Sequence, residues 1–131
     1  MKRKKLLDSF ALLAYLKKEN NYEKIKGLLL SGDVTLLINE INLGETFYIL
    51  IRERGTEKAE YFINTIFPSL AITRFANSFT DILEAAKIKA KHPISYADCF
   101  AVATALKENA SIVTGDPEFQ KVQNIVEINW L

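Results

Sequence analysis

The apolar residues of this chain change their spacing repeatedly, and each change predicts a new element. Short runs of apolar residues indicate buried strands at 4–8, 35–38, 70–72, 111–113 and 126–128. Apolar residues at helical spacing predict helices at 10–16, 22–29, 40–54, 56–67, 79–91 and 96–107. Because short strands alternate with helices, this order predicts an α/β fold with a parallel sheet.

Residues at the predicted helix ends support these boundaries. Ser9 and Ser95 stand where N-caps are expected, because a serine hydroxyl accepts a hydrogen bond from the first free N–H groups of a helix. Gly55 and Asn109 stand where two of the helices are expected to end. The pattern contains no repeat and no low-complexity linker, so we expect residues 1–131 to form a single domain.

Composition narrows the class of protein. The 131 residues are 49% hydrophobic and 25% charged, which predicts a packed globular chain. The net charge of +1 neither favours nor excludes nucleic acid, because binding depends on a local basic patch. One cysteine cannot form an internal disulfide, and no Cys/His cluster can hold zinc. The basic start of the chain imitates a signal peptide, but Asp8 interrupts the apolar run, so we expect a soluble cytoplasmic protein without membrane contact.

Four acidic residues stand where a reactive site is expected. Asp8 ends the first predicted strand and Asp116 follows the strand 111–113, and ligands of parallel sheets bind at the carboxyl ends of the strands. Asp98 lies in the first turn of a very apolar helix, where a lone carboxylate is costly unless it is paired, capped or bound to a metal. Glu45 is the single acid in the small and apolar stretch 42–48.

The position of each acid can also be explained without a reactive site. Asp98 could act only through the free N–H groups at the start of its helix. Glu45 could be a surface residue on the polar side of an ordinary helix. Asp8 and Asp116 could serve only as turn residues. The four together are harder to explain in this way, because two of them stand at strand ends of one predicted sheet.

If the four carboxylates converge, they require a cation, because like charges a few ångströms apart raise one another's pKa. Oxygen ligands without Cys or His favour hard ions, so the expected cofactor is Mg²⁺ or Mn²⁺. Such an ion lowers the pKa of a bound water and stabilises the charge on a phosphate during in-line displacement. The expected reaction is therefore hydrolysis of a phosphodiester bond.

Four motifs resemble those of PIN domains, and especially the VapC toxins of prokaryotic toxin–antitoxin pairs. They are Leu6-Leu7-Asp8-Ser9, Asn42-Leu43-Gly44-Glu45, Ser95-Tyr96-Ala97-Asp98-Cys99-Phe100 and Thr114-Gly115-Asp116-Pro117-Glu118-Phe119. They follow the family's order across nearly the whole chain. The resemblance implies a three-layer α/β fold, with a short central parallel sheet flanked by helices. It also implies a Mg²⁺- or Mn²⁺-dependent endoribonuclease. The residues that it marks are the catalytic metal ligands Asp8, Glu45, Asp98 and Asp116, with Ser9 and Thr114 in supporting roles.

The same resemblance implies partners. Members of this family act on RNA, are commonly homodimers, and are inhibited by a cognate antitoxin whose C-terminal segment can push an arginine or lysine into the acidic pocket. We therefore expect an RNA substrate, a homodimer and an antitoxin. The basic candidates for RNA contact are Lys2 to Lys5, Arg52, Arg54, Arg74, Lys87, Lys89 and Lys91, most of which we expect to be solvated surface residues.

Other classes that use acids at strand ends fit less well. A phosphoacceptor receiver domain needs an acid pair after the first strand and a lysine after a late strand. Asp8-Ser9 supplies only one acid, and no lysine stands at a suitable place late in the chain. A haloacid-dehalogenase-type phosphatase needs Asp-x-Asp, but residue 10 is Phe10. No glycine loop that could bind a nucleotide phosphate is present. The remaining alternative is a PIN-like module that binds RNA or regulates without catalysis.

Overall fold

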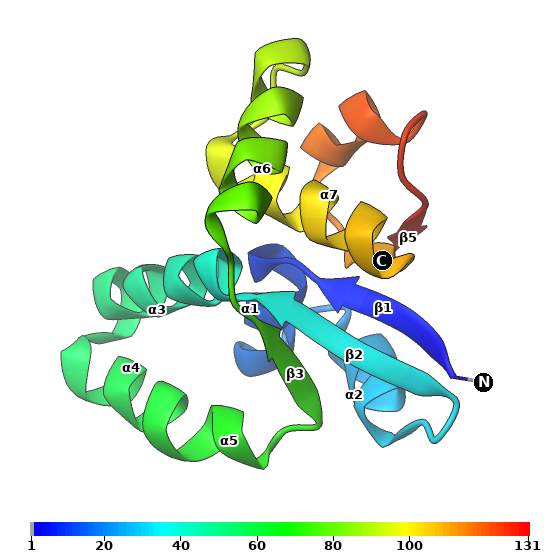
Figure 1. Ribbon diagram of the computed structural model, residues 1–131. Coiled ribbons are helices and arrows are strands. Elements are labelled where there is room, and N and C mark those ends of the chain that lie inside the picture. Colours follow the sequence, from blue (N-terminus) through cyan, green and yellow to red (C-terminus); the bar gives the residue numbers. More distant parts are fainter. Residues whose placement is uncertain (1) are drawn as a thin grey trace.

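The computed structural model describes residues 2–131 and contains one parallel sheet (Figure 1). Its strands lie in the order β3-β2-β1-β4-β5, and every neighbouring pair is parallel. The strands are β1 (Arg3–Leu7), β2 (Val34–Asn39), β3 (Ile72–Phe75), β4 (Ser111–Thr114) and β5 (Ile128–Trp130). Because parallel strands need crossover connections, the segments between them carry the helices.

The helices alternate with the strands along the chain. β1 leads into α1 (Ser9–Leu16) and α2 (Tyr22–Leu30), and β2 leads into α3 (Glu40–Arg54), α4 (Thr56–Tyr61), the π-helical turn η1 (Phe62–Ile66) and α5 (Phe67–Ser69). β3 leads into α6 (Phe79–Lys91) and α7 (Tyr96–Glu108), and β4 into the 3₁₀ helix η2 (Pro117–Val122). No helix among residues 2–131 has the length and apolar character needed to cross a bilayer.

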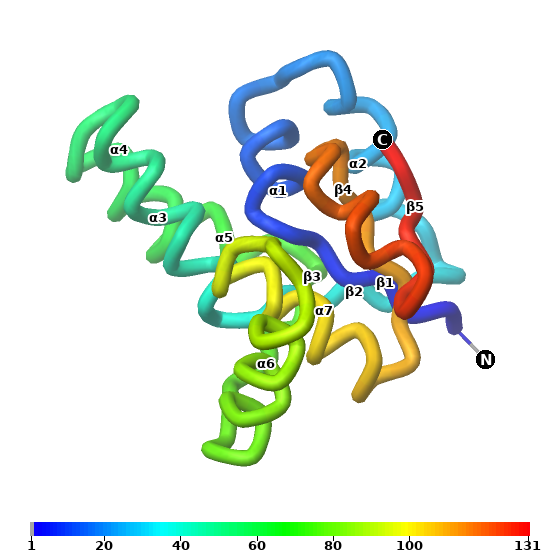
Figure 2. The backbone as a smooth tube through the Cα atoms, turned by 90° about the horizontal axis from the view of Figure 1, so that it is seen from above, coloured from blue at the N-terminus to red at the C-terminus, as the bar shows by residue number. Residues whose placement is uncertain are grey.

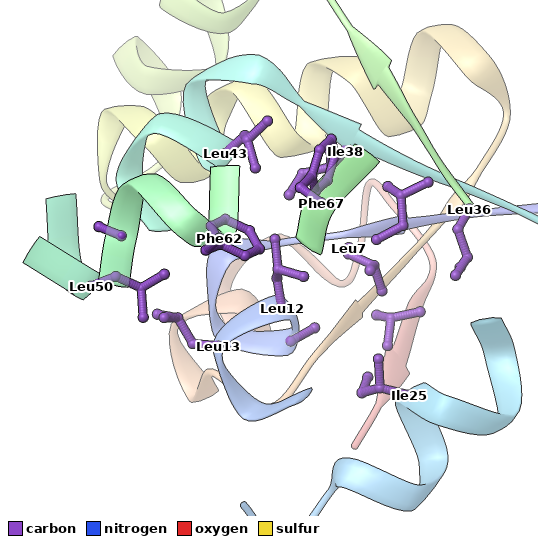
Figure 3. Close-up of a cluster of buried hydrophobic side chains, with 14 of the residues drawn as sticks. Leu7, Leu12, Leu13, Ile25, Leu36, Ile38, Leu43, Leu50, Phe62 and Phe67 are labelled. Atoms are coloured by element: carbon purple, nitrogen blue, oxygen red, sulfur yellow. The ribbon is translucent and has the colours of Figure 1, made fainter. Parts of the chain in front are cut away.

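Each face of the sheet has its own hydrophobic core. Successive strand residues face opposite sides, so Leu7 packs with α1 to α5, whereas Leu6 packs with α6, α7 and η2. Figure 2 shows α1 and α2 on one side of the sheet and α6 and α7 on the other. In the first core, Leu12, Phe62 and Phe67 lie together beneath the strands (Figure 3). This arrangement confirms the expected three-layer α/β fold.

The two edge strands lie further along the chain than the apolar pattern predicts. The strand expected at 70–72 is Ile72–Phe75, and the strand expected at 126–128 is Ile128–Trp130. An edge strand is paired on one side only and leaves polar residues exposed. Thr73 and Arg74 are exposed within β3, and Asn129 is half-buried within β5. Neither strand therefore shows the continuous apolar run that marks a buried strand.

Candidate active site

The four predicted acids come from four elements that meet at the carboxyl edge of the sheet. Asp8 follows β1 directly, and Asp116 lies two residues beyond β4, the neighbour of β1. Glu45 lies on α3, which begins where β2 ends, and Asp98 lies in the first turn of α7, which packs against α3. The charges of Asp98 and Asp116 raise the pKa of Asp8, and those of Asp116 and Glu45 raise the pKa of Asp98. Asp8, Asp98 and Asp116 thus lie within electrostatic range of one another, and Glu45 lies within range of Asp98.

Asp8 is the most deeply buried acid, with 1% of its surface exposed. Its Oδ1 accepts a hydrogen bond from Ala11 N at 2.9 Å, and its Oδ2 accepts one from the Thr114 hydroxyl at 2.5 Å. The pKa of Asp8 is raised to about 7, chiefly by burial and also by the charges of Asp98 and Asp116, against the two hydrogen bonds, which lower it. A nearby cation would therefore lower the pKa of this carboxyl group and favour its ionised form.

The expectation that Ser9 caps the first helix is wrong, because Asp8 takes that role. β1 ends at Leu7, one residue earlier than predicted, which leaves Asp8 with the extended backbone (φ −91°, ψ 179°) of an N-cap. Ser9 is the first helical residue, and its hydroxyl donates to Glu45 Oε1 at 2.5 Å. This hydrogen bond connects the start of α1 to α3 and orients the half-buried Glu45 carboxylate.

Asp98 is buried, with 8% of its surface exposed. Its pKa is raised to about 6, chiefly by burial and also by the charges of Asp116, Glu45 and Glu118, against the hydrogen bond with the Ser95 hydroxyl, which lowers it. Ser95 is the predicted N-cap of α7, since its hydroxyl accepts from Asp98 N at 3.1 Å. Ser95 takes up only one of the free N–H groups at the start of α7, so the negative charge of Asp98 also lies where the remaining N–H groups favour it.

Thr114 connects two of the acids. It is fully buried, its hydroxyl donates to Asp8 Oδ2, and the same oxygen accepts from Asp116 N at 3.0 Å. Asp116 Oδ1 accepts from Glu118 N at 3.0 Å and caps η2, so the turn role considered for Asp116 is present in the structure. One hydroxyl therefore holds Asp8 and the loop of Asp116 at a fixed separation.

Two further residues shape the site, and the sequence pattern did not single them out. Phe10 packs against Gly115, where an added Cβ would lie 2.5 Å from Phe10 Cε1. Asn42 is fully buried on α3, and its Nδ2 donates to Ala97 O at 3.1 Å, next to Asp98. Its position three residues before Glu45, on the buried side of one helix, is the signal that could have identified Asn42.

The donor set fits a hard cation that keeps much of its water. Within residues 2–131, no group of three or more His, Cys, Asp or Glu side chains is arranged to hold a metal ion. Mg²⁺ does not need such an arrangement, because it commonly uses one or two carboxylates together with waters and substrate phosphates. The site offers oxygen ligands that repel one another, and burial keeps two of them reluctant to ionise. These features suit Mg²⁺ or Mn²⁺.

The basic run at the start of the chain lies far from these acids. Lys2 to Lys5 line a hollow of about 520 Å³ at the amino edge of the sheet, together with Glu108 and Asn129. Lys5 donates to Asn129 Oδ1 at 2.6 Å. A second hollow, of about 550 Å³, lies between α6 and α7, and none of the four acids lines it.

Comparison with known proteins agrees with this fold. A family model of the PIN domain matches residues 5–125. VapBC2 from Rickettsia felis, solved bound to a DNA fragment from its promoter, is 22% identical, covering 98% of this chain and 99% of that chain with a TM-score of 0.74. VapC20 from Mycobacterium tuberculosis, a sarcin–ricin loop cleaving toxin, is 18% identical, covering 90% of this chain and 94% of that chain with a TM-score of 0.76. Comparison with curated proteins finds no significant match. At these identities the structural likeness shows a shared fold.

Proposed function

Because this chain belongs to the PIN domain family, we propose that it is a Mg²⁺- or Mn²⁺-dependent endoribonuclease that hydrolyses phosphodiester bonds of RNA. The observation that carries this proposal is the buried pair Asp8 and Asp98, whose pKa values are raised to about 7 and about 6 at the carboxyl edge of the sheet. Carboxylates that burial and mutual repulsion keep from ionising gain most from a divalent cation. The fold shared with VapC toxins supports the same class of reaction.

We assign the metal to the carboxylates of Asp8, Glu45, Asp98 and Asp116, directly or through water. When bound, the ion supplies an activated water and positive charge facing the phosphate. The Ala11 amide and the Thr114 hydroxyl orient the Asp8 carboxylate, one at each oxygen. The Ser9 hydroxyl orients the Glu45 carboxylate by donating a hydrogen bond to Oε1. Ser9 and Thr114 thus support the ligands, because each holds an acid in one orientation.

We further propose that the protein is the toxin component of a toxin–antitoxin pair in the cytoplasm, active as a homodimer and inhibited by an antitoxin. Support comes from a structural neighbour with a TM-score of 0.69 that is a toxin–antitoxin complex from Klebsiella pneumoniae. The proposal treats residues 1–131 as one domain, of which residue 1 lies outside the described residues.

The decisive experiment is RNA cleavage by the wild type and by Asp98→Asn, with Mg²⁺ or Mn²⁺ and with EDTA. We expect the wild type to cleave only with metal, leaving 5′-phosphate ends, and Asp98→Asn to be inactive. Asp33→Asn is the matched control, because Asp33 is exposed at the amino end of β2. Equal cleavage by the wild type and Asp98→Asn would refute the mechanism. Metal-independent RNA binding without cleavage would instead favour the non-catalytic module.

A further inference from the structure

An aromatic ring lies at the border of the acidic site. Phe10 follows Asp8 by two residues and is 38% exposed, whereas its neighbours Ala11 and Leu12 are fully buried. Its ring fills the space that Gly115 leaves free, since an added Cβ there would lie 2.5 Å from Cε1 and 2.9 Å from Cζ. Gly115 joins Thr114, which holds Asp8, to Asp116. The ring therefore packs against the loop that connects two of the acids while part of it stays open to solvent.

We propose that Phe10 is the residue on which a base of the RNA substrate stacks, beside the phosphate that is cleaved. This inference rests on the proposed endoribonuclease activity. Within a nucleotide, one ribose separates the base from the phosphate, so a phosphate held at the four acids brings its base close to Phe10. An exposed aromatic ring stacks on any base, because every base has a π-face.

The proposal narrows the substrate to RNA that is unpaired at the cleavage site. A base inside a duplex already stacks on both neighbours and pairs through its edge, whereas a base in a single strand or loop can turn out onto a protein ring. Phe10 has no polar atom with which to read a base edge. It therefore favours an unpaired nucleotide without selecting which base that nucleotide carries.

The test compares a short single-stranded RNA with one mapped cleavage site and the same RNA with an abasic nucleotide beside that site. Phe10→Leu keeps an apolar side chain against Gly115 but removes the ring, and Phe10→Tyr keeps the ring. We expect Phe10→Leu to lose about tenfold in kcat/KM on the normal RNA, the order of one base–aromatic stack, and to match the wild type on the abasic RNA. Phe10→Tyr should behave like the wild type on both.

Tyr61→Leu is the matched control, because Tyr61 is a 59% exposed aromatic residue on α4 and should not affect either rate. Melting temperatures of all variants with Mn²⁺ establish that they are folded and bind metal. An equal loss by Phe10→Leu on both RNAs would show that the ring only holds the Asp116 loop, and would overturn the proposal. If the wild type cleaves neither RNA, the proposed function fails. If the wild type cleaves and Phe10→Leu is unchanged on the normal RNA, only this inference fails.

Discussion

At the scale of single residues, the site places acidic side chains where they are buried. Burial disfavours the charged form of a carboxyl group. Asp8 and Asp98 are almost inaccessible to solvent, yet each faces other carboxylates. A side chain chosen for stability alone would be apolar or neutral at these positions. Because these buried carboxyl groups ionise near neutral pH, the stability of the fold should depend on pH and on metal.

We predict that the metal-free protein loses stability as the pH rises from about 4 to about 7. The pKa values of Asp8 and Asp98 in the folded state, about 7 and about 6, lie above the ordinary aspartate value of 3.8. The folded state therefore holds these two protons more tightly than the unfolded state, and this stabilisation is lost as they dissociate. Thermal unfolding in EDTA between pH 4 and pH 8 measures the loss.

Added Mn²⁺ and the variant Asp98→Asn test whether ionisation of the two buried acids causes this loss of stability. Mn²⁺ should restore most of the lost stability at pH 8, since it binds the ionised carboxylates of the folded state. Asp98→Asn should reduce the pH dependence and raise the metal-free melting temperature at pH 8, because it removes one of the repelling charges. A melting temperature that rises with pH in EDTA would contradict the assignment of these two acids as the destabilising groups.

Gly115 yields a second prediction at this scale. Gly115→Ala must displace the Phe10 ring, because the new Cβ would lie 2.5 Å from Cε1. We expect a loss of about 1 kcal/mol in the free energy of unfolding, at the low end for overpacking, since the half-exposed ring can move outward. Urea unfolding measures the change. Gly27→Ala is the control, because Gly27 lies on α2 with no atom within 4 Å of its added Cβ, so alanine should stabilise that helix.

At the scale of elements, the apolar pattern predicts the buried parts of the fold well. The helices expected at 40–54 and 79–91 are α3 and α6 with the same bounds. The prediction is poorer where tertiary contacts decide the structure. β3 is defined by its pairing with β2, which places the exposed Arg74 opposite Ile38, and periodicity alone does not predict that pairing. The helix expected at 56–67 is interrupted by the π-helical turn Phe62–Ile66, and no proline or glycine within that turn announces it.

The candidate site was predictable to a similar degree. The strand ends by themselves place Asp8 and Asp116 at one edge of the sheet. Periodicity contains no distance between helices, so the position of Glu45 beside Ser9 required the packing of α3 against α1. Phe10 could not be identified, because a phenylalanine in a first helical turn looks like an ordinary core residue.

The contact between α3 and α7 leads to a prediction at this scale. Asn42→Ala removes the hydrogen bond from Asn42 Nδ2 to Ala97 O, which joins the helix of Glu45 to the first turn of α7. We expect a loss of about 1 kcal/mol in the free energy of unfolding, the net value of one hydrogen bond, because Ala97 O lies within α7 and the buried Asn42 Oδ1 that is also removed has no partner. We also expect a weaker response to Mn²⁺, because Glu45 and Asp98 lose a shared support.

Thr46→Val separates these two effects. Thr46 is fully buried beside Glu45, but its hydroxyl donates to Asn42 O within the same helix. Its replacement should lower stability and leave the Mn²⁺ concentration for half-maximal cleavage unchanged. If Asn42→Ala and Thr46→Val shift that concentration equally, the contact between helices has no special role in metal binding.

At the scale of the whole molecule, an acidic cluster and a basic run lie at opposite edges of the sheet, although Glu108 and Glu127 also lie beside the basic run. The four acids lie at the carboxyl edge of the sheet, and Lys2 to Lys5 line a hollow at the amino edge. β1 spans the two edges with five residues, which corresponds to about 17 Å. We therefore expect Lys2 and Arg3, at the far end of β1 from Asp8, not to contact RNA at the proposed site of cleavage.

This separation predicts that neutral substitutions at the amino edge leave cleavage of a short RNA unchanged. Lys2→Gln combined with Arg3→Gln removes two exposed positive charges. At physiological ionic strength exposed charges are screened beyond about 8 Å, roughly half the length of β1, so kcat/KM should stay within about twofold of the wild type. The measurement is the cleavage rate at low and at physiological salt. If the double variant instead flattens the dependence of the rate on salt, the amino edge contacts the RNA, and the substrate must extend around the domain from one edge of the sheet to the other.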